Sequence, residues 1–387
     1  MSTKDISTMH FDTKIIHGNY NVDKMMHSMS MPICETATFG FHTVEEMDEF
    51  WEKKEYLYTR EGNPTISDLE NKLSLLNKAE DTVACASGMG AVCSTILSLI
   101  HKGEHILCSE GLFFHSTKFF SDFLNTIGAE ISYADFKDIN DVMQHIQDNT
   151  VAMFLETPAN PTLGVVDIKA IATLAHENQS LCIVDSTFAP PPIQYPLDLG
   201  ADLIIHSLTK YINGHGDALG GSVSGPKTLI NPIRKVSLPC FTGASLSPFN
   251  AWLITRGLST LSMRMDRHCH NALSIAQCLE TLPTVDYVIY PALQSHPQHY
   301  LCVTQMNGKG SGIVSFWLKN GINNMNRREA AYKFCNALDV ITVATSLGES
   351  HTLIQVENSD MIRIAVGLED ARDLVADIQQ AMNSLYQ

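Results

Sequence analysis

Six short apolar runs follow one another between positions 81 and 209, separated by polar stretches of helix length. Each run is short and almost uniformly apolar, as in a strand buried on both faces. The alternation with stretches at 90–101, 116–127, 139–148 and 167–178 predicts an α/β fold with a mostly parallel sheet. The runs are DTVACAS (81–87), HILCSE (105–110), EISYAD (130–135), VAMFLET (151–157), LCIVDST (181–187) and LIIHSLT (203–209).

The two ends of the chain have a different pattern. Residues 1–60 are polar, Met-rich and interrupted by Gly and Pro, with one short helix expected near 44–54, so we interpret them as an arm that contacts a neighbouring subunit. Residues 61–247 form the predicted large domain. Residues 248–387 form a smaller α+β domain, with a long helical stretch first and a capped helix at the end.

Composition and charge narrow the range of partners. The chain has 387 residues, of which 44% are hydrophobic, enough for a large core. The net charge of −16 disfavours binding to nucleic acid or to an anionic membrane, so a small-molecule partner is expected. The start of the chain has no apolar signal segment, and no window approaches the ~20 apolar residues of a membrane span. We therefore expect a cytoplasmic protein.

Cysteine and histidine usage does not predict a metal site. The ten cysteines are scattered without a CxxC pair, and several lie inside apolar runs, which indicates buried, reduced thiols. His296 and His299 stand close together, but no second group of metal-binding side chains lies nearby in the sequence. We expect no metal.

The first predicted strand ends in a turn made of small residues. The turn, Ser87 to Gly90, leads directly into a helix and would present backbone N–H groups to an anion such as a phosphate. The alternative is a turn that needs small residues for clearance only.

Two later strands end in charged residues that are costly to bury. Asp185 ends an apolar strand and requires a cationic partner, for which a protonated pyridine nitrogen is suitable. Lys210 follows the next strand together with Ser207 and Thr209, and burial would lower its pKa enough for imine formation. Taken singly, Asp185 could be a helix cap or an ion-pair partner, and Lys210 a surface lysine. Together, these strand ends favour a cofactor site.

At this point the sequence resembles the Cys/Met-metabolism family of enzymes that depend on pyridoxal 5′-phosphate (PLP). The resemblance covers nearly the whole chain and implies the PLP-dependent transferase fold of type I. The family includes methionine γ-lyase, cystathionine lyases, cystathionine γ-synthase and O-acetylhomoserine sulfhydrylase. The motifs are YTREGNPT (58–65), ASGMGA (86–91), ETPANPT (156–162), VDSTFAPP (184–191), HSLTKYINGHGDALGG (206–221), RGLSTLSMRMDRH (256–268), YPALQSHPQH (290–299), SLG (346–348) and IRIAVGLED (362–370).

The resemblance implies a role for each matching residue. Lys210 would hold PLP as a Schiff base and Asp185 would pair with the pyridine nitrogen, while Asn160 would lie beside the phenolic oxygen. Ser346 would lie near the lysine and the substrate, and Arg363 would bind the substrate carboxylate. The phosphate would be bound by Gly88, Met89, Ser207 and Thr209, and by Tyr58 and Arg60 of a neighbouring subunit. Such sharing implies that a dimer is required for activity, and the family resemblance implies a homotetramer built from two such dimers.

Four departures from the family pattern affect the expected chemistry. Phe113 stands where the family has a tyrosine that stacks on the cofactor and donates a proton, so stacking remains possible but acid catalysis does not. The candidate replacement acids are Tyr58, which the resemblance places near the cofactor phosphate, and His115, two residues after Phe113. Pro239-Cys240 and Thr345 replace residues typical of methionine and cystathionine lyases, and the segment after SLG is short.

The predicted function is that of a PLP-dependent carbon–sulfur lyase acting on sulfur amino acids. Its products would be a 2-oxo acid, ammonia and a thiol. The departures leave two alternatives open. One is γ-replacement on an activated homoserine ester, as in O-acetylhomoserine sulfhydrylase or cystathionine γ-synthase, and the other is a catalytically weakened PLP-binding member of the family.

Overall fold

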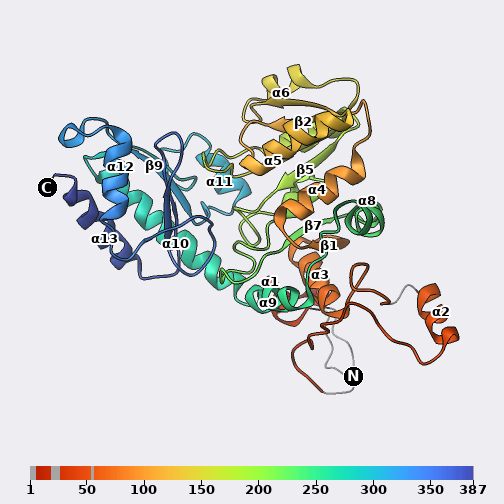
Figure 1. Cartoon of the computed structure of the whole chain (residues 1–387). Helices are drawn as coiled ribbons and strands as arrows, with labels where there is room; N and C mark the ends of the chain where they lie inside the picture. Colours follow the sequence, from red (N-terminus) through yellow and green to blue (C-terminus); the bar gives the residue numbers. More distant parts are fainter. Residues whose placement is uncertain (1–5, 19–26, 54–55, 387) are drawn as a thin grey trace.

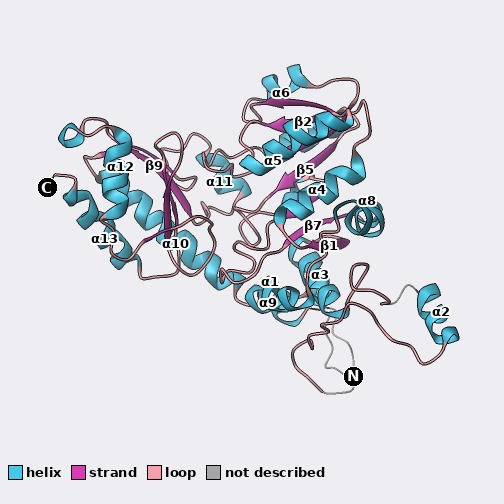
Figure 2. Ribbon diagram, in the orientation of Figure 1, coloured by secondary structure: helices cyan, strands magenta, loops and turns pink. Residues whose placement is uncertain are grey.

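The strands form two separate sheets, one in each half of the chain (Figures 1 and 2). The computed structural model describes residues 6–18, 27–53 and 56–386. The larger sheet has seven strands in the order β1-β7-β6-β5-β4-β2-β3. They are β1 (Asp81–Cys85), β2 (His105–Ser109), β3 (Glu130–Ala134), β4 (Thr150–Glu156), β5 (Leu181–Asp185), β6 (Leu203–His206) and β7 (Gly221–Gly225).

The predicted mostly parallel sheet is confirmed. Neighbouring strands are parallel except where β7 lies antiparallel to β1 and β6. All six strands expected from the apolar runs are present. Only β7 in this sheet was not expected, because its sequence GSVSG has a single large apolar residue.

Helices cover both faces of the larger sheet. In β2, Ile106 packs in one cluster with Val92 of α4, whereas the next residue, Leu107, packs with Ile171 of α7 on the opposite face. Both faces are therefore buried. The helical elements of this half are α3 (Pro64–Asn77), α4 (Gly88–Leu99), α5 (Phe114–Lys118), α6 (Ile139–His145), α7 (Ile168–Glu177), η4 (Pro196–Leu199), α8 (Lys227–Pro232) and the π-helix η5 (Ile233–Thr242).

The helix expected at 116–127 is broken into pieces. After α5, the chain winds through the π-helix η2 (Phe119–Phe123) and the 3-10 helix η3 (Leu124–Ile127). The hydroxyl groups of Ser121 and Thr126 and the side-chain amide of Asn125 donate to backbone carbonyls three or four residues earlier. Such side-chain bonds compete with regular helical hydrogen bonds, which accounts for the irregular winding.

The smaller sheet belongs to the C-terminal part, with strand order β10-β11-β12-β9-β8. Its strands are β8 (Val285–Ile289), β9 (Ile313–Leu318), β10 (Thr342–Val343), β11 (Leu353–Val356) and β12 (Ile362–Ala365). The helical elements are α9 (Pro248–Leu258), α10 (Leu261–Thr281), α11 (His299–Gln305), η6 (Ile322–Asn324), α12 (Arg327–Asn336) and α13 (Ala371–Ser384).

The long helical stretch expected after residue 248 is two helices, α9 and α10. The break lies at Thr260, whose backbone is not helical. The Gly257 carbonyl accepts hydrogen bonds from the Thr260 N–H (3.2 Å) and from Arg264 Nη2 (2.9 Å), so the normal helical pairing ends there.

The N-terminal segment divides into a packed part and a projecting part. After η1 (Ile6–Thr8), helix α1 (Phe11–His17) packs against α3 and buries Ile15. Helix α2 (Val44–Lys53) projects away from the rest of the chain and has no buried residue (Figure 1). Trp51 on α2 is 68% exposed. The proposed contact of this arm with a neighbouring subunit stays a prediction.

None of the helices in the described part of the chain has the length and apolar composition of a membrane span. Within the same residues, His, Cys, Asp and Glu side chains do not gather in a group that could hold a metal. His296 and His299 bond to nearby backbone instead. All ten cysteines are free, and most are buried, although Cys240 is exposed.

Candidate active site

A pocket of about 570 Å³ lies at the carboxyl ends of β4, β5 and β6, where the large sheet meets the loop before β11. All expected site residues except Tyr58 and Arg60 line it. The lining includes Gly88, Met89, Phe113, His115, Glu156, Asn160, Asp185, Thr187, Ser207, Thr209, Lys210, Thr345, Ser346, Gln355 and Arg363.

One side of the pocket is built to receive an anion. Ser87 caps α4, accepting a hydrogen bond from the Gly90 N–H at 3.0 Å, so the first turn of the helix faces the pocket. A Cβ at Gly88 would lie 2.8 Å from the Ser207 Cβ, so this approach requires glycine. Thr209 is held by hydrogen bonds in both directions with Gly220. Helix N–H groups and two hydroxyls together fit a phosphate.

Asp185 ends β5 and faces the pocket. Its Oδ1 accepts hydrogen bonds from the Thr187 N–H (2.9 Å) and the Thr187 hydroxyl (2.6 Å). Burial raises the pKa of Asp185, and the two bonds from Thr187 oppose this rise. Among the described residues, no cationic side chain forms an ion pair with it. Asp185 therefore lacks the cation that would stabilise its charge, as expected for the partner of a pyridinium nitrogen.

Glu156 is a second buried carboxyl that the sequence analysis missed. It ends β4 and stands in register with Asp185 on β5. Its Oε2 accepts a hydrogen bond from the Phe113 N–H at 2.8 Å. Burial and the nearby Asp185 raise the pKa of Glu156 well above its usual value. The sequence contained a signal for Glu156, because this residue ends an apolar run in the same way as Asp185.

The Lys210 amine lies in the middle of the pocket. Its Nζ donates to the Ser346 hydroxyl at 2.7 Å. Burial lowers the pKa of Lys210, and the Arg363 charge lowers it further, while Glu349 opposes them. Ser346 has a φ of +90°, a rare conformation for a residue with a side chain. The amine is thus shifted toward its neutral, nucleophilic form.

Arg363, on β12, also lines the pocket. Its Nη1 donates to Asn160 Oδ1 (2.9 Å) and its Nη2 to the Ser346 carbonyl (3.3 Å). Its Nε is buried and has no hydrogen-bond partner within the described residues. Burial lowers the pKa of Arg363, and Glu357, 3.6 Å from Nη1, opposes this effect. Arg363 thus has one N–H group without a partner, and its guanidinium borders a pocket in which a carboxylate would find a planar, cationic donor.

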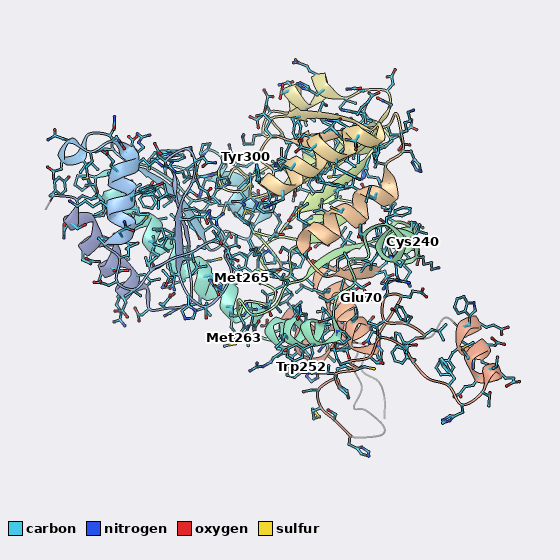
Figure 3. All side chains as sticks on the ribbon, viewed as in Figure 1. Glu70, Cys240, Trp252, Met263, Met265 and Tyr300 are labelled. Carbon is cyan, nitrogen blue, oxygen red and sulfur yellow. The ribbon has the colours of Figure 1, made fainter. Side chains whose placement is uncertain are left out.

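The remaining expected residues divide into two groups. Phe113 and His115 line the pocket with ring centroids 5.1 Å apart. Tyr58 and Arg60 lie elsewhere in the same chain, with the Arg60 guanidinium 5.2 Å from the centre of the Tyr58 ring. Arg60 and Cys240 line a separate pocket. Cys240 lies on the flank of the large domain that faces away from the C-terminal sheet (Figure 3). A single chain therefore does not bring Tyr58 and Arg60 to Lys210.

A parallel α/β sheet that places a lysine, a buried aspartate and an anion cradle at its strand ends defines a PLP-dependent enzyme. The family model for Cys/Met metabolism PLP-dependent enzymes matches residues 12–360. The chain belongs to this family, which confirms the family and cofactor expected from the motifs.

Similarity to individual proteins extends over the full chain. It is 37% identical to an L-methionine γ-lyase of Treponema denticola, with 100% of both chains covered. It is 38% identical to an O-succinylhomoserine sulfhydrylase of Pseudomonas aeruginosa, over 85% of this chain and 84% of that protein. The crystal structure of metB from Corynebacterium glutamicum matches with a TM-score of 0.92 at 36% identity, covering 98% of this chain and 100% of that one.

The residues of the pocket fit pyridoxal phosphate. The close approach of Gly88 to Ser207 leaves the helix N–H groups of α4 open to an anion, and Asp185 offers an uncompensated carboxylate. Lys210 and Arg363 line the same pocket as this carboxylate. Each chemical group of the cofactor therefore has a fitting partner in the pocket: helix N–H groups and hydroxyls for the phosphate, the Lys210 amine for the aldehyde, and Asp185 for the ring nitrogen.

We predict that Asp185→Asn stabilises the cofactor-free protein while weakening cofactor binding. Because burial raises the pKa of Asp185 above its ordinary 3.8, its ionisation destabilises the folded state as pH rises above that value. The melting temperature of apo Asp185→Asn should exceed that of the parent at about pH 7, and the gain should shrink toward about pH 4. Affinity for PLP should fall, because a neutral amide does not stabilise a ring cation.

Asp148→Asn, which removes an exposed carboxylate outside the pocket, serves as the control. It should change neither the pH dependence of melting nor the affinity. A lower melting temperature for apo Asp185→Asn would show that Asp185 is a structural hydrogen-bonding residue instead.

Proposed function

We propose that this protein is a carbon–sulfur lyase acting on sulfur-containing amino acids, by γ-elimination from methionine, homocysteine or cystathionine or by β-elimination from cysteine. The products would be a 2-oxo acid, ammonia and a thiol. Support comes from the methionine γ-lyase relative that is 37% identical over the whole chain. The observation that carries the proposal is the Lys210 amine, hydrogen-bonded to Ser346 and placed in one pocket with Asp185 and Arg363.

In this proposal each side chain has one task. Bound pyridoxal phosphate supplies the electron sink for negative charge that develops at the substrate Cα. Arg363 binds the substrate carboxylate through its free donor, while Asn160 and the Ser346 carbonyl hold the guanidinium in place. Lys210, with its lowered pKa, takes the Cα proton, and Ser346 orients Nζ for that transfer. Asp185 supplies the negative charge that pairs with the ring nitrogen of the cofactor.

The proposal includes a homotetramer in which Tyr58 and Arg60 complete the phosphate site of a neighbouring subunit. Their distance from the pocket of their own chain and the projection of α2 support it. The cytoplasmic location stays a prediction from the sequence.

γ-Replacement on an activated homoserine ester is the second candidate. The specific observation in its favour is Phe113, which lines the pocket but has no hydroxyl group to protonate a leaving thiolate. An ester leaves as a carboxylate and needs less protonation. The sulfhydrylase relative is compatible with this candidate. The structure offers no comparable support for a catalytically weakened member, because Lys210, Asp185 and Arg363 line one pocket.

The proposed function predicts ammonia and a 2-oxo acid in equal amounts. PLP-loaded enzyme would be incubated with methionine, homocysteine, cystathionine or cysteine, and also with O-acetylhomoserine plus sulfide. We expect a thiol or sulfide together with the two other products from at least one sulfur amino acid, and no turnover by Lys210→Ala. Formation of a new amino acid from the ester, without ammonia, would identify the enzyme as a γ-replacement catalyst.

A second prediction concerns the acid that replaces the missing phenol. If His115 protonates the leaving group, His115→Phe should lower kcat/KM for thiolate leaving groups by about 10²–10⁴-fold and affect O-acetylhomoserine much less. Phe113→Tyr should raise the rate for thiol substrates, because it restores an acid at that place. Equal losses for both substrate types in His115→Phe would exclude this role.

A third prediction tests the shared site. A Tyr58→Ala/Arg60→Ala double variant and Lys210→Ala should each be inactive alone. After exchange between equal amounts of the two variants, about half of the dimers are mixed, and each mixed dimer has one intact site out of two. Activity should therefore return to about a quarter of the parent value. A lack of recovery, with exchange demonstrated by differently tagged subunits, would place both residues outside the active site.

A further inference from the structure

Thr187 lies two residues beyond Asp185, in the loop that follows β5. Its hydroxyl oxygen is 2.6 Å from Asp185 Oδ1 and 2.8 Å from the backbone nitrogen of Ser207. Thr187 also lines the pocket. One hydroxyl therefore joins the aspartate at the end of β5 to the loop that carries Ser207 and the anion cradle.

The direction of these hydrogen bonds follows from their donors. The Ser207 N–H is only a donor, so the Thr187 oxygen accepts from it. The single hydroxyl proton is then free to point at Asp185 Oδ1. The Thr187 N–H donates to the same oxygen at 2.9 Å. Oδ1 thus accepts two hydrogen bonds, while Oδ2 takes none from the described residues.

We propose that Thr187 is a positioning residue that keeps Asp185 ionised and turns its free oxygen, Oδ2, toward the ring nitrogen of bound pyridoxal phosphate. Two hydrogen bonds on one oxygen fix the rotation of the carboxylate. Asp185 is mostly buried but retains some exposed surface, and it lines the pocket. The oxygen without a partner is therefore the one available to the cofactor.

The neighbouring Glu156 explains why the charge on Asp185 needs to be stabilised by Thr187. Glu156 and Asp185 stand in register on adjacent strands, and neither forms an ion pair with a cationic side chain of the described residues, so two full negative charges there would repel each other. The hydroxyl of Thr187 stabilises the charge on Asp185 specifically. The bonds from Thr187 also lower the pKa of Asp185 against the effect of burial.

The test compares the affinity of the apoprotein for PLP with its affinity for a deaza analogue, in which a C–H group replaces the ring nitrogen. Both ligands carry the same phosphate and the same aldehyde, so their affinity ratio reports the interaction with the ring nitrogen alone. The parent protein should prefer PLP. Thr187→Val, which keeps the shape but removes the hydroxyl, should reduce this preference by about tenfold or more. Thr187→Ser should restore it.

Ser186→Ala is the matched control, because Ser186 belongs to the same loop and is fully buried. Its hydroxyl donates to the Ala189 carbonyl and accepts from Gln194, so it does not contact Asp185. This variant should lower the melting temperature but leave the affinity ratio unchanged. If Thr187→Val does not fold, Thr187→Ala takes its place in the comparison.

Two results would overturn the inference. Equal losses of affinity for both ligands in Thr187→Val would show that Thr187 acts only through Ser207 and the phosphate. A parent protein without preference for PLP would show that Asp185 does not meet the ring nitrogen. The inference rests on the proposed role of Asp185 but is independent of the substrate, because affinity is measured without one. Failure of the lyase proposal would leave the ratio unchanged.

Discussion

Helices bury both faces of the large sheet, and this burial restricts the polar site residues to the ends of the strands. A side chain in the middle of a strand such as β4 or β5 is packed against helices on either side, so charged groups there would lose their hydration without compensation. Polar groups are tolerated where the strands end. Glu156, Asp185 and Ser207 occupy that position on three adjacent strands, and the pocket is the space between these ends and the C-terminal sheet.

The same constraint leaves the site electrostatically incomplete without its cofactor. Asp185 and Glu156 are buried carboxyls whose pKa values are raised, whereas burial lowers the pKa of Lys210. Each group is destabilised in its charged form by the loss of water. A ligand with a cationic ring and an anionic phosphate compensates the aspartate and the helix N-terminus together, so its binding energy also stabilises the fold.

The sequence predicted the strands that are uniformly apolar and the site residues whose charge makes burial costly. Uniformly apolar runs identified six strands, and Asp185 and Lys210 were noticed because they end such runs. Strand β7 was missed because it lacks apolar residues. The fold needs small residues there, since a Cβ at Gly221 would lie 2.0 Å from the Ser87 carbonyl oxygen. Thr187 was missed because a hydroxyl after a strand is common, and its importance depends on its contacts with Asp185 and Ser207.

The short hairpin between β11 and β12 shows what sequence spacing alone does not reveal. The chain turns back within residues 357–361, with the Glu357 N–H bonded to the Met361 carbonyl at 2.7 Å. Gln355 pairs with Arg363 across the hairpin, so both side chains lie on one face, and Glu357, two residues further along the chain, lies on that face as well.

The hairpin places the Glu357 carboxylate, held by the Gln355 amide, beside the Arg363 guanidinium. Arg363 is thus held by Asn160, the Ser346 carbonyl and Glu357 before any substrate arrives. A guanidinium fixed on three sides cannot swing to follow a misplaced carboxylate. If Arg363 binds the substrate carboxylate as proposed, this hairpin would select substrates by the position of their carboxylate relative to Lys210, and would leave the side chain of the substrate to be selected elsewhere in the pocket.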